Sequence, residues 1–167
     1  MKKKIMLFVS VVILMIFSSS FAIEGTVAKV GSLAPDVEML NDDDSSSIED
    51  YRGKYLLLTF WSSTDGRSRL KCNQYNSFFK RQSQKEGENQ VEFVAVNFDK
   101  NKVLFDELVR YDNLIPGSQY YVSEKEFKQI SRAYNLFNGL KSYLIDPSGR
   151  IVMVNPDESQ LTKIMSN

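Results

Sequence analysis

Two short and almost wholly apolar runs limit the folds open to this chain more than any other feature. Residues 55–61 read Tyr-Leu-Leu-Leu-Thr-Phe-Trp, and residues 91–97 read Val-Glu-Phe-Val-Ala-Val-Asn. Apolar runs of this length without alternation are typical of parallel strands that are buried on both faces of a sheet. Between them, residues 65–84 predict a helix, since large apolar side chains recur at helical spacing: Leu70, Tyr75, Phe78 and Phe79.

Three further segments have the pattern of helices. Residues 103–111 and 124–134 each carry an apolar stripe at helical spacing, made of Val103, Leu104, Leu108 and Tyr111 in the first and of Phe127, Ile130 and Tyr134 in the second. Residues 157–165 predict a closing helix, with Asp157 as its N-cap.

Two hairpins complete the expected elements. Residues 142–145 and 151–154 are apolar runs on either side of a turn that contains proline and glycine, which predicts an antiparallel pair. A short amino-terminal hairpin is expected within residues 23–46, where turn-forming residues are frequent. The sequence therefore predicts an α/β fold, with a central mixed β-sheet flanked by helices and an amino-terminal β-hairpin extension.

The first 22 residues have the pattern of a secretory signal peptide. Three lysines precede an apolar run over residues 5–17, and Ser20 and Ala22 place small side chains where signal peptidase reads. A membrane anchor is the alternative, but this run is shorter than the ~20 residues that cross a bilayer. We predict cleavage after residue 22, one domain over residues 23–167, and a mature protein in the periplasm or outside the cell, without membrane attachment.

The composition excludes several classes of function. The chain has no histidine, which removes a histidine base, a Ser-His-Asp triad and histidine-based zinc sites. Its single cysteine, Cys72, leaves no intramolecular disulfide. Loss of three lysines with the signal peptide leaves 18 basic and 21 acidic residues, so nucleic acid is disfavoured as a partner. We predict no cofactor and no metal site.

Several segments, taken in order, resemble one family. These are Gly-Ser-Leu-Ala-Pro-Asp at 31–36, Asp-Tyr-Arg-Gly-Lys-Tyr at 50–55, Phe-Trp-Ser-Ser at 60–63, Phe-Val-Ala-Val-Asn at 93–97, and Tyr-Leu-Ile-Asp at 143–146 followed by Gly-Arg-Ile-Val at 149–152. Together they resemble exported thioredoxin-like thiol:disulfide oxidoreductases of the cytochrome-maturation type, which are related to peroxiredoxins. The resemblance extends over nearly the whole mature chain and implies a thioredoxin-like fold.

The departures from this family fall on its chemistry. Where the family has W-C-x-x-C-R, residues 64–69 read Thr-Asp-Gly-Arg-Ser-Arg, so that Asp65 stands for the nucleophilic cysteine and Ser68 for the resolving one. Leu140 stands for the cis-proline, which leads us to expect a trans peptide bond there. Thr59 stands where thioredoxins have a buried acid. Since neither a carboxylate nor a hydroxyl attacks a disulfide, the resemblance implies a degenerate redox site without dithiol exchange.

Two residues of this region have an ordinary structural interpretation. Asp65 is expected at the start of a helix, where aspartate is among the favoured N-caps, and this interpretation is preferred over mimicry of a thiolate charge. Cys72 lies about one helical turn after Ser68 and is expected to be a buried core thiol. The alternative is an exposed, reactive monothiol.

A binding surface is expected around the vestigial site. We predict that it involves Trp61, Thr64, Asp65, Arg67, Phe137 and Leu140, with Tyr120, Tyr121 and Arg69 nearby. The basic residues Arg67 and Arg69 would attract an acidic peptide. The function expected is that of an exported thioredoxin-like module that binds a protein or peptide. The alternatives are a thiol oxidoreductase or peroxidase-like activity through Cys72 and a purely structural subunit.

Overall fold

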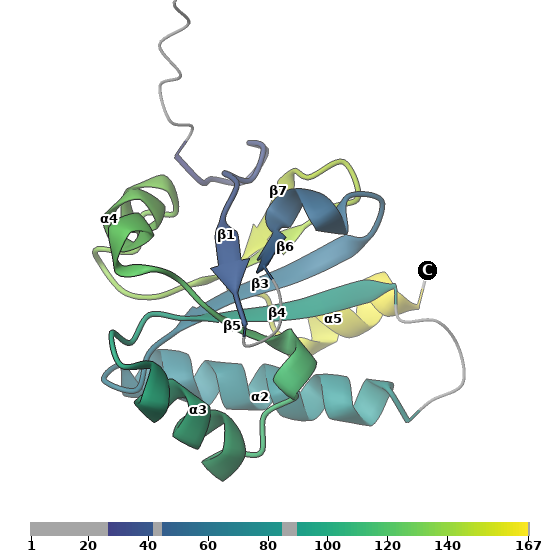
Figure 1. The fold of residues 1–167 in the computed structure, drawn as a ribbon. Helices are drawn as coiled ribbons and strands as arrows, with labels where there is room; N and C mark the ends of the chain where they lie inside the picture. Colours follow the sequence, from purple (N-terminus) through teal and green to yellow (C-terminus); the bar gives the residue numbers. More distant parts are fainter. Residues whose placement is uncertain (1–26, 42–44, 85–89, 167) are drawn as a thin grey trace, which may run out of the picture.

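The computed structural model describes residues 27–41, 45–84 and 90–166 (Figure 1). The predicted signal peptide, residues 1–22, lies outside them, as do residues 42–44 of the expected hairpin segment. None of the helices in the described ranges has the length and apolar character needed to cross a membrane.

A mixed sheet forms the centre of the described structure, with the strand order β2-β1-β5-β4-β3-β6-β7. Strands β3, β4 and β5 are parallel to one another, and β6, β7, β1 and β2 extend the sheet in antiparallel pairs. The strands are β1 Glu38–Leu40, β2 Ser45–Ser47, β3 Tyr55–Trp61, β4 Val91–Asn97, β5 Gln119–Tyr121, β6 Ser142–Ile145 and β7 Ile151–Val154. The expected α/β fold with its mixed sheet and amino-terminal hairpin is confirmed.

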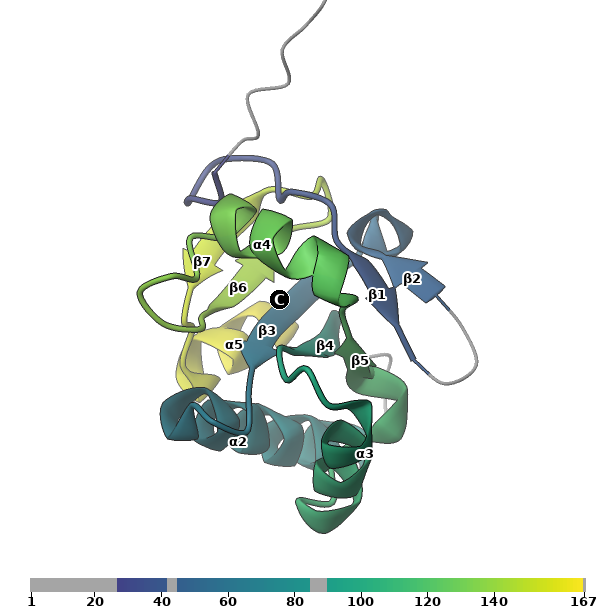
Figure 2. The ribbon, with the colours of Figure 1, turned by 60° about the vertical axis from the view of Figure 1, so that its left-hand side comes forward.

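Helices cover both faces of this sheet. Figures 1 and 2 show α2 and α3 together with α5 on one side and α4 on the other. The helices are α2 Gly66–Gln82, α3 Lys102–Tyr111, α4 Glu124–Ala133 and α5 Glu158–Met165, with short 3₁₀ helices η1 Ile48–Tyr51 and η2 Pro116–Ser118. The expected helices are therefore present, within one or two residues of their predicted bounds.

Strand β3 packs against the helices on both faces of the sheet, which explains its unbroken apolar run. Leu56, Leu58 and Phe60 pack in the cluster beneath α4, whereas Leu57 and Trp61 pack in the cluster beneath α2 and α5. A central strand with helices on both faces has no solvent side, so that alternation with polar residues is lost.

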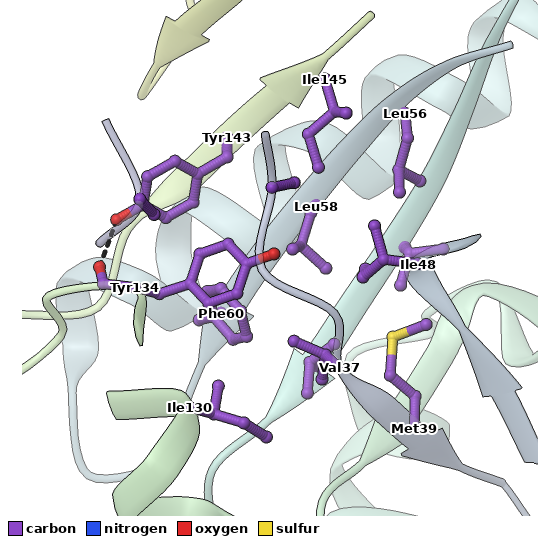
Figure 3. Close-up of a cluster of buried hydrophobic side chains, with 14 of the residues drawn as sticks. Val37, Met39, Ile48, Leu56, Leu58, Phe60, Ile130, Tyr134, Tyr143 and Ile145 are labelled. Carbon is purple, nitrogen blue, oxygen red and sulfur yellow. Dashed lines mark hydrogen bonds between the residues drawn. The ribbon is translucent and has the colours of Figure 1, made fainter. Parts of the chain in front are cut away.

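An aromatic group joins β3 to the segment that follows α4. The rings of Phe60 and Tyr134 lie 4.9 Å apart, and those of Tyr134 and Tyr143 lie 5.1 Å apart. Figure 3 shows these rings together, with the Tyr143 hydroxyl donating a hydrogen bond to the carbonyl oxygen of Tyr134. Leu140 packs against the same cluster. The end of α4 and the loop before β6 are thereby fixed against the sheet.

Two predictions about helix faces are wrong. Leu70 is 60% exposed, so that it does not belong to the buried face of α2. In α3, the predicted stripe is largely exposed, with Tyr111 at 83%, while Phe105 is buried in the core. Helix α3 packs through a face that includes Phe105, Leu108 and Val109, since this is the face that meets Trp61 and Tyr121.

Candidate ligand cleft

A cleft of about 630 Å³ lies between the amino end of α2 and the loop that leads into β6. Asp65, Arg67, Ser68 and Lys71 line it on the α2 side. The opposite side and the floor are formed by Phe60, Asn138, Gly139, Leu140, Lys141, Ser142 and Asn155. The two positions that replace the family's cysteines, Asp65 and Ser68, thus lie in one cleft with Leu140, as the resemblance implied.

Asp65 is the N-cap of α2. Its Oδ1 accepts hydrogen bonds from the backbone N–H groups of Arg67, at 3.1 Å, and Ser68, at 3.3 Å. These groups would otherwise lack partners at the start of the helix. The carboxylate is therefore used to begin α2, as expected.

Ser68 closes the same turn. It is buried, its Oγ donates to the carbonyl oxygen of Asp65 at 2.9 Å, and the same Oγ accepts from the N–H of Ser62 at 3.2 Å. The hydroxyl both donates to and accepts from the backbone, so that both positions that stand for the family's cysteines have a structural use.

A tether that sequence reasoning missed holds the loop between β3 and α2. Asp99 Oδ1 accepts from the hydroxyls of Ser62, at 2.6 Å, and Ser63, at 3.0 Å, and Oδ2 accepts from the Ser63 N–H at 2.9 Å and from Asn97 Nδ2 at 2.9 Å. Burial raises the pKa of Asp99, but the hydrogen bonds from Ser62, Asn97 and Ser63 outweigh it and leave that pKa below its ordinary value.

The position of Asp99 in the sequence carried a signal for this contact. It follows the carboxyl end of β4, and Ser62 and Ser63 follow the carboxyl end of β3. Because β3 and β4 are adjacent and parallel, residues just beyond their ends meet at the same sheet edge.

Cys72 lies in the core and not in the cleft. Its side chain is 1% exposed and packs in the cluster that contains Leu57 and Trp61. Burial raises the pKa of the Cys72 thiol, and the negative charge of Asp112 raises it further. Since the thiolate is the reactive form, these surroundings favour an inert thiol.

Three of the expected surface residues lie elsewhere. Trp61 is 0% exposed and packs near Phe105, and Tyr120 is also buried, because β3 and β5 are covered by helices on the faces where these rings point. Arg69 points to α3, where its Nε and Nη2 each donate to a carboxylate oxygen of Asp112 at 2.7 Å. These three residues do not contribute an accessible surface to the cleft.

Tyr121 also lies away from the cleft, where its ring packs against Phe105. Four other expected residues remain at least partly accessible. Arg67 is exposed on its wall, and Leu140 lines it while half-buried. Thr64 is exposed beside it, with Oγ1 3.0 Å from Ser62 Oγ. Phe137 is 65% exposed but is not among the lining residues.

The remaining parts of the family's redox apparatus are also changed. The described residues contain no cis peptide bond, and Gly139 before Leu140 has φ +116°. Thr59 is buried, and its hydroxyl oxygen has no hydrogen-bond partner in the described part of the chain. Nor do three acidic or cysteine side chains gather there closely enough to hold a metal ion.

Solved structures similar to this one are thioredoxin-like. A thioredoxin-like protein from Parabacteroides distasonis is 24% identical, with a TM-score of 0.68 over 85% of this chain and 98% of its own. The thioredoxin domain of a thiol-disulfide oxidoreductase from Bacteroides vulgatus is 21% identical, with a TM-score of 0.70 over 83% and 96%. A thiol:disulfide interchange protein from Bacteroides sp. is 19% identical, with a TM-score of 0.73 over 84% and 92%.

These similarities confirm the thioredoxin-like fold. No curated protein sequence matches the chain significantly. The family model described as AhpC/TSA matches residues 30–154, which include every strand of the sheet and helices α2, α3 and α4. The chain belongs to the AhpC/TSA family.

Proposed function

We propose that this protein is an exported thioredoxin-like module that binds a protein or peptide in its cleft and does not catalyse dithiol exchange. The observation that carries the proposal is that the cleft persists while both cysteine positions hold residues that build α2. Asp65 caps the helix and Ser68 closes its first turn. Around them the lining leaves about 630 Å³ open to a ligand.

The available thiol supports this proposal over an enzymatic one. Exchange begins with a thiolate that reaches a disulfide sulfur and needs a second thiol to resolve the mixed disulfide. Cys72 is the single cysteine of the chain, it lies on the buried face of α2, and burial raises its pKa. Export is supported by the lysines and apolar run within residues 1–22.

A pair of thiol assays tests the redox part of the proposal. We expect Cys72 in the folded protein to react with a chromogenic disulfide reagent only after unfolding, and we expect no reduction of insulin. Rapid labelling of the folded protein together with turnover of insulin would overturn the proposal in favour of a monothiol enzyme.

A rebuilt redox motif provides the matched control. The double variant Asp65→Cys with Ser68→Cys places both thiols where the family has them, at the start of α2. We expect this variant to form a disulfide and to reduce insulin measurably, because the thiolate would lie at a helix N-terminus. Insulin reduction by this variant would show that the assay detects dithiol exchange on this scaffold when both thiols are present.

A plugged cleft tests the binding part of the proposal. Arg67→Trp places a large ring on the exposed wall of the cleft, and Gln74→Trp places the same ring on an exposed position of α2 outside it. On an array of random-sequence peptides, we expect the wild type and Gln74→Trp to bind the same subset and Arg67→Trp to lose it. Equal binding by all three proteins would contradict a role for the cleft.

A further inference from the structure

The charged residues of the cleft differ from the charge of the molecule. Arg67, Lys71 and Lys141 line the cleft together with one acidic residue, Asp65, which leaves an excess of two positive charges. The chain from residue 23 onward has more acidic than basic residues. The positive cleft is therefore a local feature that the overall composition does not produce.

Each basic group retains the capacity to bind an anion. Arg67 is exposed, and its guanidinium makes no hydrogen bond or ion pair within the described residues. Lys141 Nζ donates one hydrogen bond, to the carbonyl oxygen of Asn135 at 2.9 Å, and an ammonium group has three donors. Lys71 Nζ lies 4.7 Å from the centre of the Tyr75 ring, a contact that uses none of its hydrogen-bond donors on a carboxylate.

The acidic groups near the cleft are already engaged. Asp65 Oδ1 accepts two backbone N–H groups of α2, and the helix N-terminus offsets part of its charge. The charges of Asp157 and Lys71 interact, but the carboxylate of Asp157 is also the N-cap of α5. Hydrogen bonds from Ser159 and the Gln160 N–H are the main causes that lower the pKa of Asp157, and the Lys71 charge adds to them.

From these contacts we infer that the cleft selects peptides that carry acidic side chains. This inference rests on the proposed function, because it names the chemistry of the peptide that the cleft binds. The three cations come from two walls, Arg67 and Lys71 from α2 and Lys141 from the loop before β6. A glutamate or aspartate side chain that enters between them meets positive charge on both sides, whereas a basic side chain is repelled.

Matched peptides test this selection on the protein purified after expression of the full chain. One labelled peptide of glycine, serine and leucine carries several glutamates, and a second has glutamine at the same positions. We expect the glutamate peptide to bind more tightly, by ~two- to fivefold for each cation that it contacts, and its advantage to shrink as salt is raised. Shifts of backbone amide signals would locate both peptides.

Two triple variants separate the cleft from the general surface. Arg67→Gln, Lys71→Gln and Lys141→Gln remove the cations of the cleft, whereas Lys125→Gln, Lys128→Gln and Arg132→Gln remove as many from the exposed side of α4. We expect the first variant to bind both peptides equally and the second to retain the preference of the wild type.

The possible results distinguish this inference from the proposed function. Equal affinity of the wild type for the two peptides, with signal shifts in the cleft, overturns acidic selection and leaves peptide binding standing. Binding of neither peptide, or shifts outside the cleft that Arg67→Trp does not abolish, overturns both. An acidic preference that persists in the first triple variant overturns acidic selection by these three residues.

Discussion

At the scale of single residues, the start of α2 has structural roles for the two residues that stand where the resembled family has cysteines. A nucleophilic cysteine at a helix N-terminus is stabilised as a thiolate by the helix dipole and by free N–H groups. Asp65 occupies the same place with a permanent negative charge and accepts two of those N–H groups. In this protein the helix N-terminus is therefore paired with a carboxylate that stabilises α2.

Substitution of Asp65 separates the role of its charge from its role as a cap. We expect Asp65→Ala to lower the free energy of unfolding by about 1 kcal/mol, because two N–H groups lose their acceptor. Asp65→Asn should cost only a few tenths of that, since asparagine caps helices as well as aspartate does. Urea unfolding measures both. An equal loss in the two variants would mean that charge, and not capping, is what the position supplies.

Substitution of Cys72 tests its place in the core. Cys72→Ala leaves a small cavity and is expected to lower the unfolding free energy by about 1 kcal/mol. Cys72→Ser places a hydroxyl in the same apolar cluster, and we expect a larger loss, of roughly 1–3 kcal/mol. Urea unfolding of both variants is the measurement. Serine tolerated as well as alanine would indicate a thiol that reaches solvent, against the burial described here.

At the scale of elements, an ion pair joins the first two helices of the α2 layer. Arg69 in α2 donates two hydrogen bonds to Asp112, which is the C-cap of α3, and Asn73 Nδ2 donates a third at 3.3 Å. The hydrogen bond from Arg69 is the main cause that lowers the pKa of Asp112, and it exceeds the opposing effect of burial. The position of α3 against α2 therefore depends on an ionised carboxylate.

This dependence predicts a response to acid. A carboxylate whose folded-state pKa is lowered contributes stability that is fully present above its unfolded pKa of about 3.9 and is lost as the pH falls through the folded value. Asp99 and Asp112 both have lowered pKa values. We expect unfolding free energy to fall below about pH 4, and to fall less steeply in Asp112→Asn than in the wild type. Parallel acid profiles for the two proteins would contradict this coupling.

The sequence predicts best those elements whose residue pattern allows only one way of packing. The apolar runs of β3 and β4 have no polar side to expose, so that only a doubly covered sheet suits them. Helix α3 had two acceptable faces: Leu104 with Leu108 and Tyr111, or Phe105 with Leu108 and Val109. Spacing alone does not choose between these faces. The face that packs is the one that fits the surface of β3 and β5. The sequence pattern of α3 alone contains no information about that surface.

The site was predictable to a similar degree. Asp65, Ser68 and Leu140 were placed in one cleft because the family resemblance aligns them along the chain. Lys71 and Lys141 were missed, since residues distant in sequence become neighbours only when the sheet brings α2 beside the loop before β6.

Strand β5 was missed because three residues are too few to show a periodic pattern.

At the scale of the whole molecule, the proposed export predicts where the mature chain begins. Expression of the full chain in bacteria should yield a mature protein that begins at Ile23, as the small residues Ser20 and Ala22 predict. Mass spectrometry of the purified protein measures this start. The variant Leu14→Arg, which interrupts the apolar run, should keep residues 1–22. An unprocessed wild type in the membrane fraction would support an anchor instead.

The replacement of both cysteines has a consequence for how the cleft responds to its surroundings. A dithiol site alternates between two covalent states, and the reduction potential of its compartment sets their ratio. A cleft bounded by Asp65 and Ser68 has one covalent state under oxidising and reducing conditions alike. Under the proposed function, occupancy of such a cleft does not depend on the reduction potential, so that the protein would act in the same way before and after a change in the thiol balance of its environment.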